Sequence, residues 1–122
     1  MRQAIVVDDS RVMRRILCKI LDELGYEVAE AGDGQEALDS LDRLSDLSLA
    51  LVDWNMPIMN GIDFVKALRS ERDYDLVRIV MVTSEVAVTK MMQALNAGAD
   101  EFVMKPFTRD VIEEKLALVG LS

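Results

Sequence analysis

One stretch decides the fold of this chain: LSLALVD at residues 47–53, six mostly apolar residues followed directly by a carboxylate. An apolar run of this length is typical of a strand that is buried on both faces of a parallel sheet. Two other runs repeat the pattern, since Ile5–Val7 precedes Asp8-Asp9 and Val77–Val82 precedes Thr83-Ser84. The sequence therefore predicts a sheet whose buried strands end in polar side chains.

Between these runs the apolar residues recur at the spacing of an α-helix. Ser10 and Thr108 stand where N-cap residues belong, and Gly25 and Gly98 stand where helices stop. The pattern predicts strands at 5–7, 26–31, 47–52, 77–82 and 101–104, and helices at 11–24, 35–44, from about 61 through 68, at about 86–96 and after 108 through 119. Strands that alternate with helices indicate an α/β fold, in which right-handed crossovers build a doubly wound parallel sheet with helices on both faces.

The helix expected at about 86–96 is apolar over much of its surface. Helical spacing directs four of its large apolar residues toward the core, which leaves Val86 as a candidate for an exposed contact. These four are Val88, Met91, Met92 and Leu95. Methionines at this spacing are explained by core packing and need no cofactor.

Composition narrows the class of function. The 122 residues include 14 Lys and Arg against 22 Asp and Glu, a net charge of −8, and no histidine. This excess of acid argues against nucleic-acid binding, and the lack of histidine excludes histidine-based catalysis and imidazole-ligated zinc. A single cysteine, Cys18, cannot form an internal disulfide, and no apolar run reaches the roughly 20 residues of a membrane helix. We expect one cytoplasmic domain over residues 1–122, with no separate output domain and no nucleic-acid or membrane partner.

Polar groups from separate strands are expected to meet at one edge of the sheet. In a parallel sheet the carboxyl ends of the strands share an edge, and open α/β proteins bind ligands there. Helix capping or the start of a loop explains any one of these groups, and a structural salt bridge explains Lys105 with one aspartate, but neither explains why all of them gather. The groups are Asp8, Asp9, Asp53, Thr83 and Lys105.

Three carboxylates in one crevice repel one another and raise one another's pKa values unless a cation joins them. Oxygen ligands without histidine or cysteine favour Mg²⁺. A carboxylate beside a bound Mg²⁺ can act as a nucleophile and become an aspartyl phosphate, while a lysine neutralises charge on the transferred group. The pattern indicates phosphoryl transfer to an aspartate.

These motifs resemble the receiver domain of two-component response regulators. Asp8-Asp9, Asp53, Thr83-Ser84 and Lys105-Pro106-Phe107 carry the resemblance, which covers the whole chain. The segments Asp53-Trp54-Asn55-Met56-Pro57 and Asn60-Gly61 look most like chemotaxis members of the family. The resemblance implies the strand order 2-1-3-4-5 and a cis Lys105-Pro106 bond.

The family resemblance also implies how the phosphoryl group is handled. Asp53 would accept it from a partner sensor histidine kinase, and the protein would catalyse only its own phosphorylation and dephosphorylation. Lys105 and the Thr83 hydroxyl would bind phosphoryl oxygens, together with the Ser84 backbone N–H and Asn55.

A metal set follows from the same resemblance. Asp9 and Asp53 would ligate Mg²⁺ directly, together with the backbone carbonyl of Asn55. Asp8 would act largely through water.

The resemblance finally implies a switch. Thr83 would move toward the phosphoryl group and allow Phe102 to rotate inward, although a tyrosine is familiar at this place and phenylalanine lacks its hydroxyl. The output surface would comprise the fourth helix, fifth strand and fifth helix, and it would bind a downstream target protein, with a flagellar switch as one candidate. Asn55 and Glu85 would tune hydrolysis of the aspartyl phosphate; alternatively, Glu85 only adds a favourable charge to the first turn of a helix.

Other functions remain open at this point. A phosphatase of the haloacid-dehalogenase type expects a second aspartate where this chain has Asn55, and a flavodoxin-like flavin binder expects hydroxyl groups where this chain has Asp8-Asp9. A single-domain receiver outside chemotaxis, acting as a phosphate shuttle or sink, fits the same residues.

Overall fold

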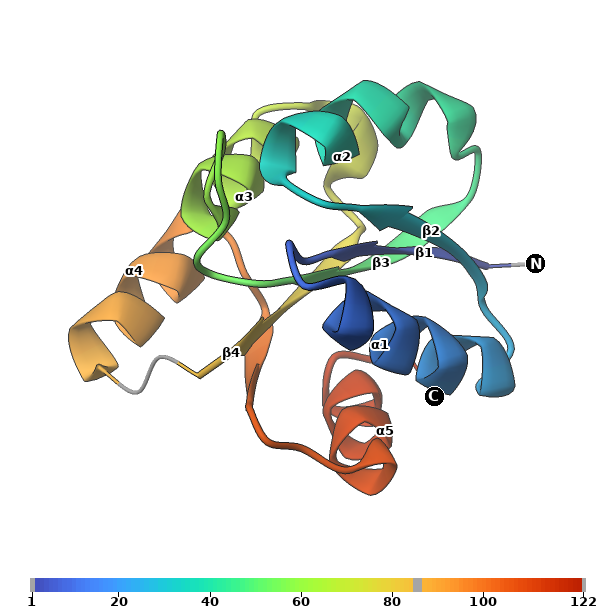
Figure 1. Cartoon of the computed structure of the whole chain (residues 1–122). Coiled ribbons are helices and arrows are strands. Elements are labelled where there is room, and N and C mark those ends of the chain that lie inside the picture. Colours follow the sequence, from blue (N-terminus) through green and yellow to red (C-terminus); the bar gives the residue numbers. More distant parts are fainter. Residues whose placement is uncertain (1, 85–86, 122) are drawn as a thin grey trace.

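The predicted alternation of strands and helices is confirmed in a computed structural model, which describes residues 2–84 and 87–121 (Figure 1). All strand pairs are parallel, and the order β2-β1-β3-β4-β5 is the one that the family resemblance implies. Within the described residues, no helix has the length and apolar character that crossing a bilayer requires. In chain order the elements are β1 (Gln3–Val7), α1 (Arg11–Glu23), β2 (Glu27–Ala31), α2 (Gly34–Ser40), the 3₁₀-helix η1 (Leu41–Arg43), β3 (Leu47–Val52), α3 (Gly61–Arg69), the 3₁₀-helix η2 (Arg72–Tyr74), β4 (Arg78–Thr83), α4 (Val88–Ala97), β5 (Glu101–Met104) and α5 (Arg109–Leu118).

The sheet separates two apolar cores, because successive side chains of each strand point to opposite faces. Ile5 and Val7 of β1 enter the core under α2, α3 and α4, whereas Ala4 and Val6 enter the core under α1 and α5. All five residues of β1 are buried, which explains why its sequence shows no polar alternation. The helices thus cover both faces of the sheet (Figure 1).

The helix boundaries are set by the capping residues that the sequence predicts. The Ser10 and Thr108 hydroxyl oxygens accept hydrogen bonds from the N–H groups of Met13 and Val111 at the starts of α1 and α5. Gly98 is the C-cap of α4 with φ of +122°. A side chain there would be strained, so glycine ends this helix.

Several element boundaries differ from the prediction, and three of these differences have a clear structural meaning. The helix expected at 35–44 is divided into α2 and η1, because the chain tightens after Ser40. The strand expected at 26–31 begins at Glu27, although Tyr26 before it is buried. The strand expected at 77–82 is β4, which extends to Thr83 and so holds this hydroxyl group within the sheet.

The prediction that the large apolar residues of α4 face the core was wrong. Val88 is 69% exposed, and Met92 and Leu95 are also exposed, while Met91 is only partly buried. The buried residue of this helix is Ala94, which joins the core next to Ala97. The small alanines allow α4 to pack closely on the molecule, so its larger side chains point outward. The predicted contact residue Val86 lies outside the described residues.

Candidate functional site

Three carboxylates meet at the carboxyl ends of β1 and β3. The parallel register pairs Val7 with Val52, and the Asp53 N–H donates a 2.8 Å hydrogen bond to the Val7 carbonyl, so the residues after both strands lie side by side. One carboxylate oxygen from each of Asp8, Asp9 and Asp53 lies within 4.8 Å of the others. Asp8 is 1% exposed, the Asp53 side chain is 13% exposed, and Asp9 is exposed. Exposure therefore increases from Asp8 through Asp53 to Asp9, and the cluster is open to solvent on the side of Asp9.

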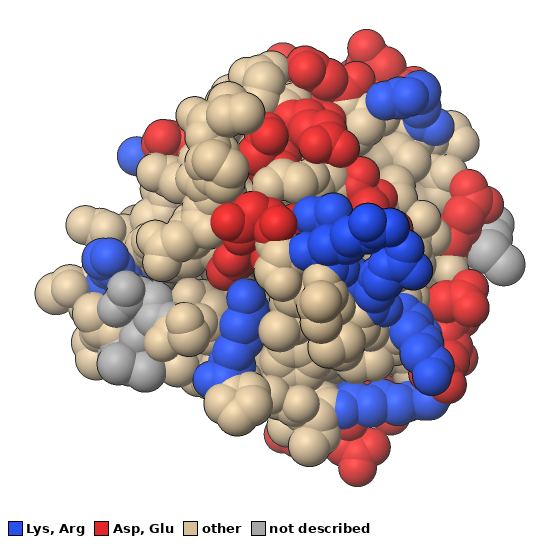
Figure 2. Space-filling model, viewed as in Figure 1, with Lys and Arg blue, Asp and Glu red and all other residues tan. Residues whose placement is uncertain are grey.

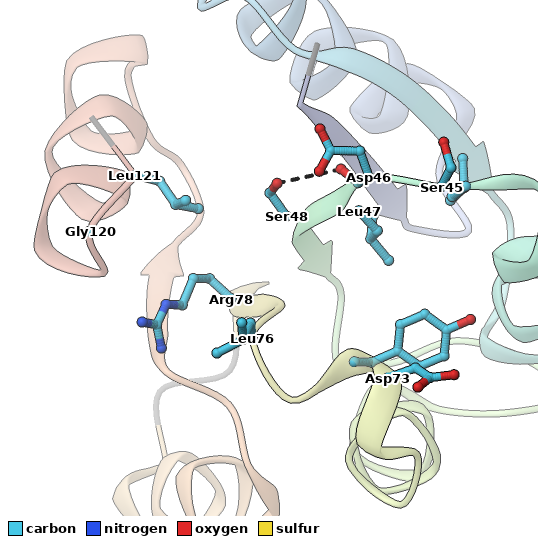
Figure 3. A pocket seen from close by; sticks show the side chains of 11 residues that line it. Ser45, Asp46, Leu47, Ser48, Asp73, Leu76, Arg78, Gly120 and Leu121 are labelled. Carbon is cyan, nitrogen blue, oxygen red and sulfur yellow. Dashed lines mark hydrogen bonds between the residues drawn. The ribbon is translucent and has the colours of Figure 1, made fainter.

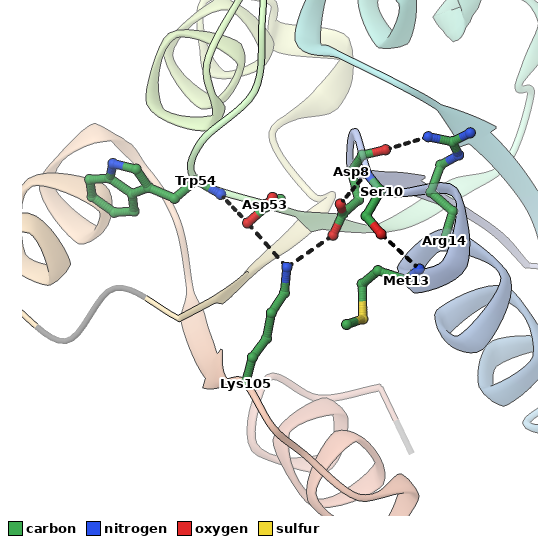
Figure 4. Close-up of polar contacts among 7 residues, drawn as sticks. All are labelled: Asp8, Ser10, Met13, Arg14, Asp53, Trp54 and Lys105. Atoms are coloured by element: carbon green, nitrogen blue, oxygen red, sulfur yellow. Dashed lines mark hydrogen bonds and ion pairs between the residues drawn. The ribbon is translucent and has the colours of Figure 1, made fainter.

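Lys105 closes this cluster from the end of β5. Its ammonium lies 3.2 Å from Asp8 Oδ2 and 3.4 Å from Asp53 Oδ1, between the two carboxylates (Figure 4). The Lys105-Pro106 bond is cis, as the family resemblance implies. The predicted salt bridge of Lys105 to an aspartate therefore exists, and it involves two aspartates from two strands.

Backbone N–H groups also hold the carboxylates of Asp8 and Asp53 in place. Asp8 Oδ1 accepts a 2.8 Å hydrogen bond from Ser10 N–H, and Asp53 Oδ1 accepts one of 2.8 Å from Trp54 N–H (Figure 4). The Trp54 side chain points away from the carboxylates in this view, and the Lys90 ammonium lies 6.0 Å from its ring centroid. The carboxylates are thus oriented before any ligand arrives.

Arg14 is a site-supporting residue that the sequence did not reveal. It lies in α1 with Arg11 and Arg15, where a run of arginines is typical of a solvated helix face. In the structure its Nη1 donates a 2.6 Å hydrogen bond to the Asp8 carbonyl, and its Nε lies 3.2 Å from Glu30 Oε1. Arg14 therefore ties the turn after β1 to β2.

The electrostatics of the cluster raise the pKa of Asp53. Burial is the main cause, and the Asp8 charge adds to it, while Lys105 and the Trp54 N–H act in the opposite direction. The raised pKa means that Lys105 and the Trp54 N–H do not fully offset the effects of burial and of the Asp8 charge on Asp53. A further cation would relieve this repulsion.

The donor set fits a divalent metal ion. Three carboxylates whose oxygens lie within 4.8 Å of one another offer hard oxygen ligands, and the exposed Asp9 leaves a side open to water and phosphate. Asn55 lies two residues after Asp53 in an exposed position, so its backbone carbonyl belongs to the loop that begins at Asp53. The raised pKa of Asp53 agrees with a site that is electrostatically incomplete without a cation.

Thr83 and Ser84 stand beside the cluster at the end of β4. Thr83 is buried, and its carbonyl accepts a 2.9 Å hydrogen bond from the Lys105 N–H. Ser84 follows it at an exposed bend. The predicted tuning residue Glu85 lies outside the described residues.

Phe102 lies in β5 opposite Met81 of β4. Its ring is half-buried and packs against the core under α3 and α4. The Lys115 ammonium of α5 lies 5.6 Å from the ring centroid. Core packing, the ordinary explanation for this residue, therefore does not account for the contact of the ring with Lys115.

The loop after Asp53 is held in an unusual turn. Ile58 has φ of +68°, and the Met59 N–H donates a 2.7 Å hydrogen bond to the Pro57 carbonyl, which together form a γ-turn. A Cβ on Gly61 would lie 2.2 Å from the Asp53 carbonyl oxygen, so only glycine fits where α3 begins. The tight approach of α3 to Asp53 depends on this glycine.

A cavity at the opposite edge of the sheet does not share this chemistry. It measures about 520 Å³ and lies near the starts of β3 and β4 (Figure 3). Its polar groups are partly engaged, since Ser48 Oγ donates to the Asp46 carbonyl at 3.4 Å and the Asp46 N–H donates to the Gln3 side chain at 2.8 Å. The carboxylate cluster and Lys105 lie at the other edge of the sheet.

The surface over the site carries both signs of charge. Figure 2 shows acidic side chains gathered at the strand ends, with basic side chains beside them over α1. The first turns of α1 contribute Arg11, Arg14 and Arg15. An anionic group that approaches the site from this side would thus pass close to these arginines.

Comparison with known proteins agrees with this geometry. Residues 4–117 match the response regulator receiver domain. The chain belongs to the response regulator receiver family. The receiver is 46% identical over 116 residues to the chemotaxis protein CheY1 of Helicobacter pylori, with 94% of each chain covered. It is 45% identical over 113 residues to a CheY homolog of Campylobacter jejuni, which covers 92% of this chain and 87% of the relative.

Solved structures of receivers have the same fold. The chemotaxis protein CheY4 of Vibrio cholerae superposes with a TM-score of 0.90 at 34% identity, covering 98% of both chains. A CheY-like receiver domain protein of Methanospirillum hungatei superposes with a TM-score of 0.86 at 29% identity, covering 97% of this chain and 92% of that one. Receivers are signalling switches activated by phosphorylation, and they are not enzymes in the usual sense.

Proposed function

We propose that Asp53 accepts a phosphoryl group from a phosphohistidine of a partner sensor histidine kinase. An Asp53 carboxylate oxygen attacks phosphorus, a P–O bond forms as the P–N bond breaks, and the leaving imidazole nitrogen takes a proton from solvent. The observation that carries this proposal is the position of Asp53, whose oxygen faces the Lys105 ammonium at 3.4 Å within a cluster of carboxylates. The 13% exposure of its side chain leaves it accessible to a donor.

The neighbouring groups would stabilise the transferred charge. Lys105 neutralises one phosphoryl oxygen, and the Thr83 hydroxyl and Ser84 backbone N–H bind others. The 2.9 Å bond between the Lys105 N–H and the Thr83 carbonyl supports this assignment, because it places both groups at the ends of neighbouring strands. Asn55, exposed after Asp53, offers a further polar contact.

Asp8, Asp9, Asp53 and the Asn55 carbonyl would hold Mg²⁺. When bound, the ion supplies positive charge that offsets the carboxylate repulsion and the negative charge of the phosphoryl oxygens. Asp8 is buried and already bonded to Lys105 and Ser10, which favours an indirect role through water. Asp9 is exposed and Asp53 is half-buried, which favours direct ligation.

Phosphorylation would be read through Thr83 and Phe102. A phosphoryl group adds about two negative charges and draws the Thr83 hydroxyl toward it, which makes room for the Phe102 ring to move inward. The face of α4, β5 and α5 then binds a downstream protein. The exposed apolar side chains of Val88, Met92 and Leu95 on α4 support a protein partner there.

We assign this receiver to chemotaxis, because relatives at about 45% identity over most of the chain carry that name. A flagellar switch component is the proposed target, and the cytoplasm is the proposed location of the reaction. Asn55 and Glu85 are proposed to set the rate at which water removes the phosphoryl group. Autophosphorylation from small donors such as acetyl phosphate belongs to the same proposal.

Beryllofluoride, a mimic of the phosphoryl group, provides the direct test. In the presence of Mg²⁺ it should change the fluorescence of Trp54, whose backbone N–H donates a hydrogen bond to the Asp53 carboxylate. The Asp53→Asn variant should not respond, and Asp39→Asn, which changes an exposed aspartate of α2, should respond as wild type does. A silent wild type, or an equal response in Asp53→Asn, would refute the acceptor assignment.

The pathway requires a second experiment. The beryllofluoride form and the untreated form are each used to capture partners from a lysate of the source cells. Capture of a flagellar switch component by the activated form alone supports chemotaxis. Capture of a histidine-containing phosphotransfer protein, without a switch component, would favour a phosphate shuttle or sink.

A further inference from the structure

We propose that Lys115 is a positioning residue for the switch: together with Glu101 it holds the Phe102 ring in its unphosphorylated position. This inference rests on the proposed function, because it assumes that Phe102 moves on phosphorylation. The Lys115 ammonium lies 5.6 Å from the Phe102 ring centroid and 3.6 Å from Glu101 Oε1. Glu101 Oε1 also accepts a 3.0 Å hydrogen bond from the Phe102 N–H. One carboxylate thus joins the backbone of the switch residue to the cation that contacts its ring.

The fold brings these three groups together from two elements. Glu101 and Phe102 are the first two residues of β5, and Lys115 lies in the last turns of α5, which packs on the sheet beside them. The Lys115 and Glu101 side chains are both partly buried. An ion pair sheltered in this way keeps its geometry better than a fully exposed one. The ammonium is therefore held near the ring rather than moving freely in solvent.

The contact between the Lys115 ammonium and the ring matters more because residue 102 is phenylalanine and not tyrosine. Without a hydroxyl, the ring cannot be tethered by a hydrogen bond of its own, and its only electrostatic handle is the negative face of its π-system. The ring also packs against the apolar core. Rotation away from the present position would break the contact with Lys115, so this contact opposes the switch.

The size of the effect follows from the strength of a partly exposed cation–π contact. Such contacts shift an equilibrium by about two- to fivefold. A ligand that binds the switched state gains apparent affinity when the competing state loses stability. Removal of the Lys115 charge should therefore raise the affinity for beryllofluoride in Mg²⁺ by about two- to fivefold.

The test is a titration of Trp54 fluorescence with beryllofluoride at fixed Mg²⁺, on the full chain. Lys115→Met removes the charge and keeps an apolar stem, and it should bind about two- to fivefold more tightly than wild type. Lys115→Arg keeps both the ion pair and the cation over the ring, and it should restore wild-type affinity. Lys19→Met, at an exposed position of α1, removes the same charge elsewhere and should leave the affinity unchanged. Because beryllofluoride is a small ligand, any contact of Lys115 with a protein partner does not enter the measurement.

Two further measurements separate positioning from simple stabilisation of α5. Lys115 also lies near the C-terminus of that helix, where a cation is favourable for the helix dipole. A dipole effect would lower the thermal stability of Lys115→Met without changing affinity. Fluorine NMR of protein labelled at its three phenylalanines, with the Phe102 signal identified by Phe102→Leu, should show the Phe102 signal shifted in Lys115→Met and unchanged in Lys115→Arg. In Glu101→Gln the affinity should rise in the same direction, and the double variant should not exceed Lys115→Met.

The outcomes distinguish this inference from the proposed function. A wild-type protein that ignores beryllofluoride overturns both. A wild-type response with equal or weaker affinity in Lys115→Met overturns the role of Lys115 and leaves Asp53 as the acceptor. Tighter binding in both Lys115→Met and Lys115→Arg also overturns it, because the cation would then be irrelevant.

Discussion

The backbone N–H of Lys105 donates a 2.9 Å hydrogen bond to the carbonyl of Thr83, so the ends of β4 and β5 are joined at the candidate site. Lys105, which faces Asp53, and Thr83 are therefore held at the joined ends of two neighbouring strands. A displacement of either strand end would move both groups. Single substitutions at this edge of the sheet are therefore expected to change the stability of the protein or its response to beryllofluoride.

The charge of Asp53 should destabilise the folded protein at neutral pH. Its pKa is raised above the ordinary value of 3.8, so the folded state disfavours the ionised form. The penalty is absent when the carboxyl is protonated in both states and is complete once pH exceeds the raised pKa. In metal-free buffer, Asp53→Asn should therefore be more stable than wild type at pH 7, and this difference should shrink as pH falls toward 3.8. Urea unfolding at several pH values checks this, and a difference independent of pH would contradict it.

Relief of the strained turn at Ile58 should stabilise the protein. Its φ of +68° places a β-branched residue in the left-handed region, which costs roughly 1–2 kcal/mol. Because Ile58 is 85% exposed, little packing is lost on substitution. Ile58→Asn should raise the free energy of unfolding by about 1 kcal/mol. Leu76→Asn is the matched control, since Leu76 is also 85% exposed, and it should give no gain.

A side chain at position 61 should damage both stability and the site. The Cβ of Gly61→Ala would lie 2.2 Å from the Asp53 carbonyl oxygen, so α3 or the acceptor loop must shift. We expect a loss of about 1–3 kcal/mol in the free energy of unfolding and a weaker beryllofluoride response. Gly32→Ala is the control, because its Cβ would come no closer than 3.4 Å to Glu36 Oε2. Equal losses in the two variants would show that the contact with Asp53 is not the cause.

Cys18 should react slowly with alkylating reagents in the folded protein. Burial is the main cause that raises its pKa from the ordinary value of 9.0 to about 11, with Glu30 adding to the rise. Near pH 8 this lowers the fraction of thiolate roughly 100-fold. Mass spectrometry after iodoacetamide treatment should show slow modification in the native protein and fast modification in denaturant. Similar rates in both would mean that the thiol is not protected.

The sequence predicted the strand ends well because their physics is local. Asp8 and Asp53 each follow an apolar run, and a parallel sheet must bring such ends to one edge. The prediction of which face of α4 is buried was wrong, because it gave the large apolar residues more weight than Ala94. Ala94 is the residue of this helix that is buried in the core. Small side chains at a close helix contact leave a weak signal in the sequence.

Other features depend on tertiary geometry that no local pattern contains. Nothing near Ile58 in the sequence predicts a left-handed backbone, since isoleucine ordinarily favours extended structure. The contacts of Arg14 with the Asp8 carbonyl and of Lys115 with Phe102 depend on how α1 and α5 dock on the sheet. A one-dimensional pattern gives the face of a helix but not its rotation and offset against the neighbouring strand.

The Lys105 ammonium and the Asp8 carboxylate lie 3.2 Å apart in space but 97 positions apart along the chain. During synthesis on a ribosome, the aspartates after β1 and β3 emerge long before the lysine that faces them. A nascent or proteolytically shortened chain that lacks β5 and the residues after it therefore carries Asp53, the proposed acceptor, without the Lys105 ammonium beside it. Under the proposed mechanism, the complete charge arrangement of the site therefore forms only after β5 has been synthesised.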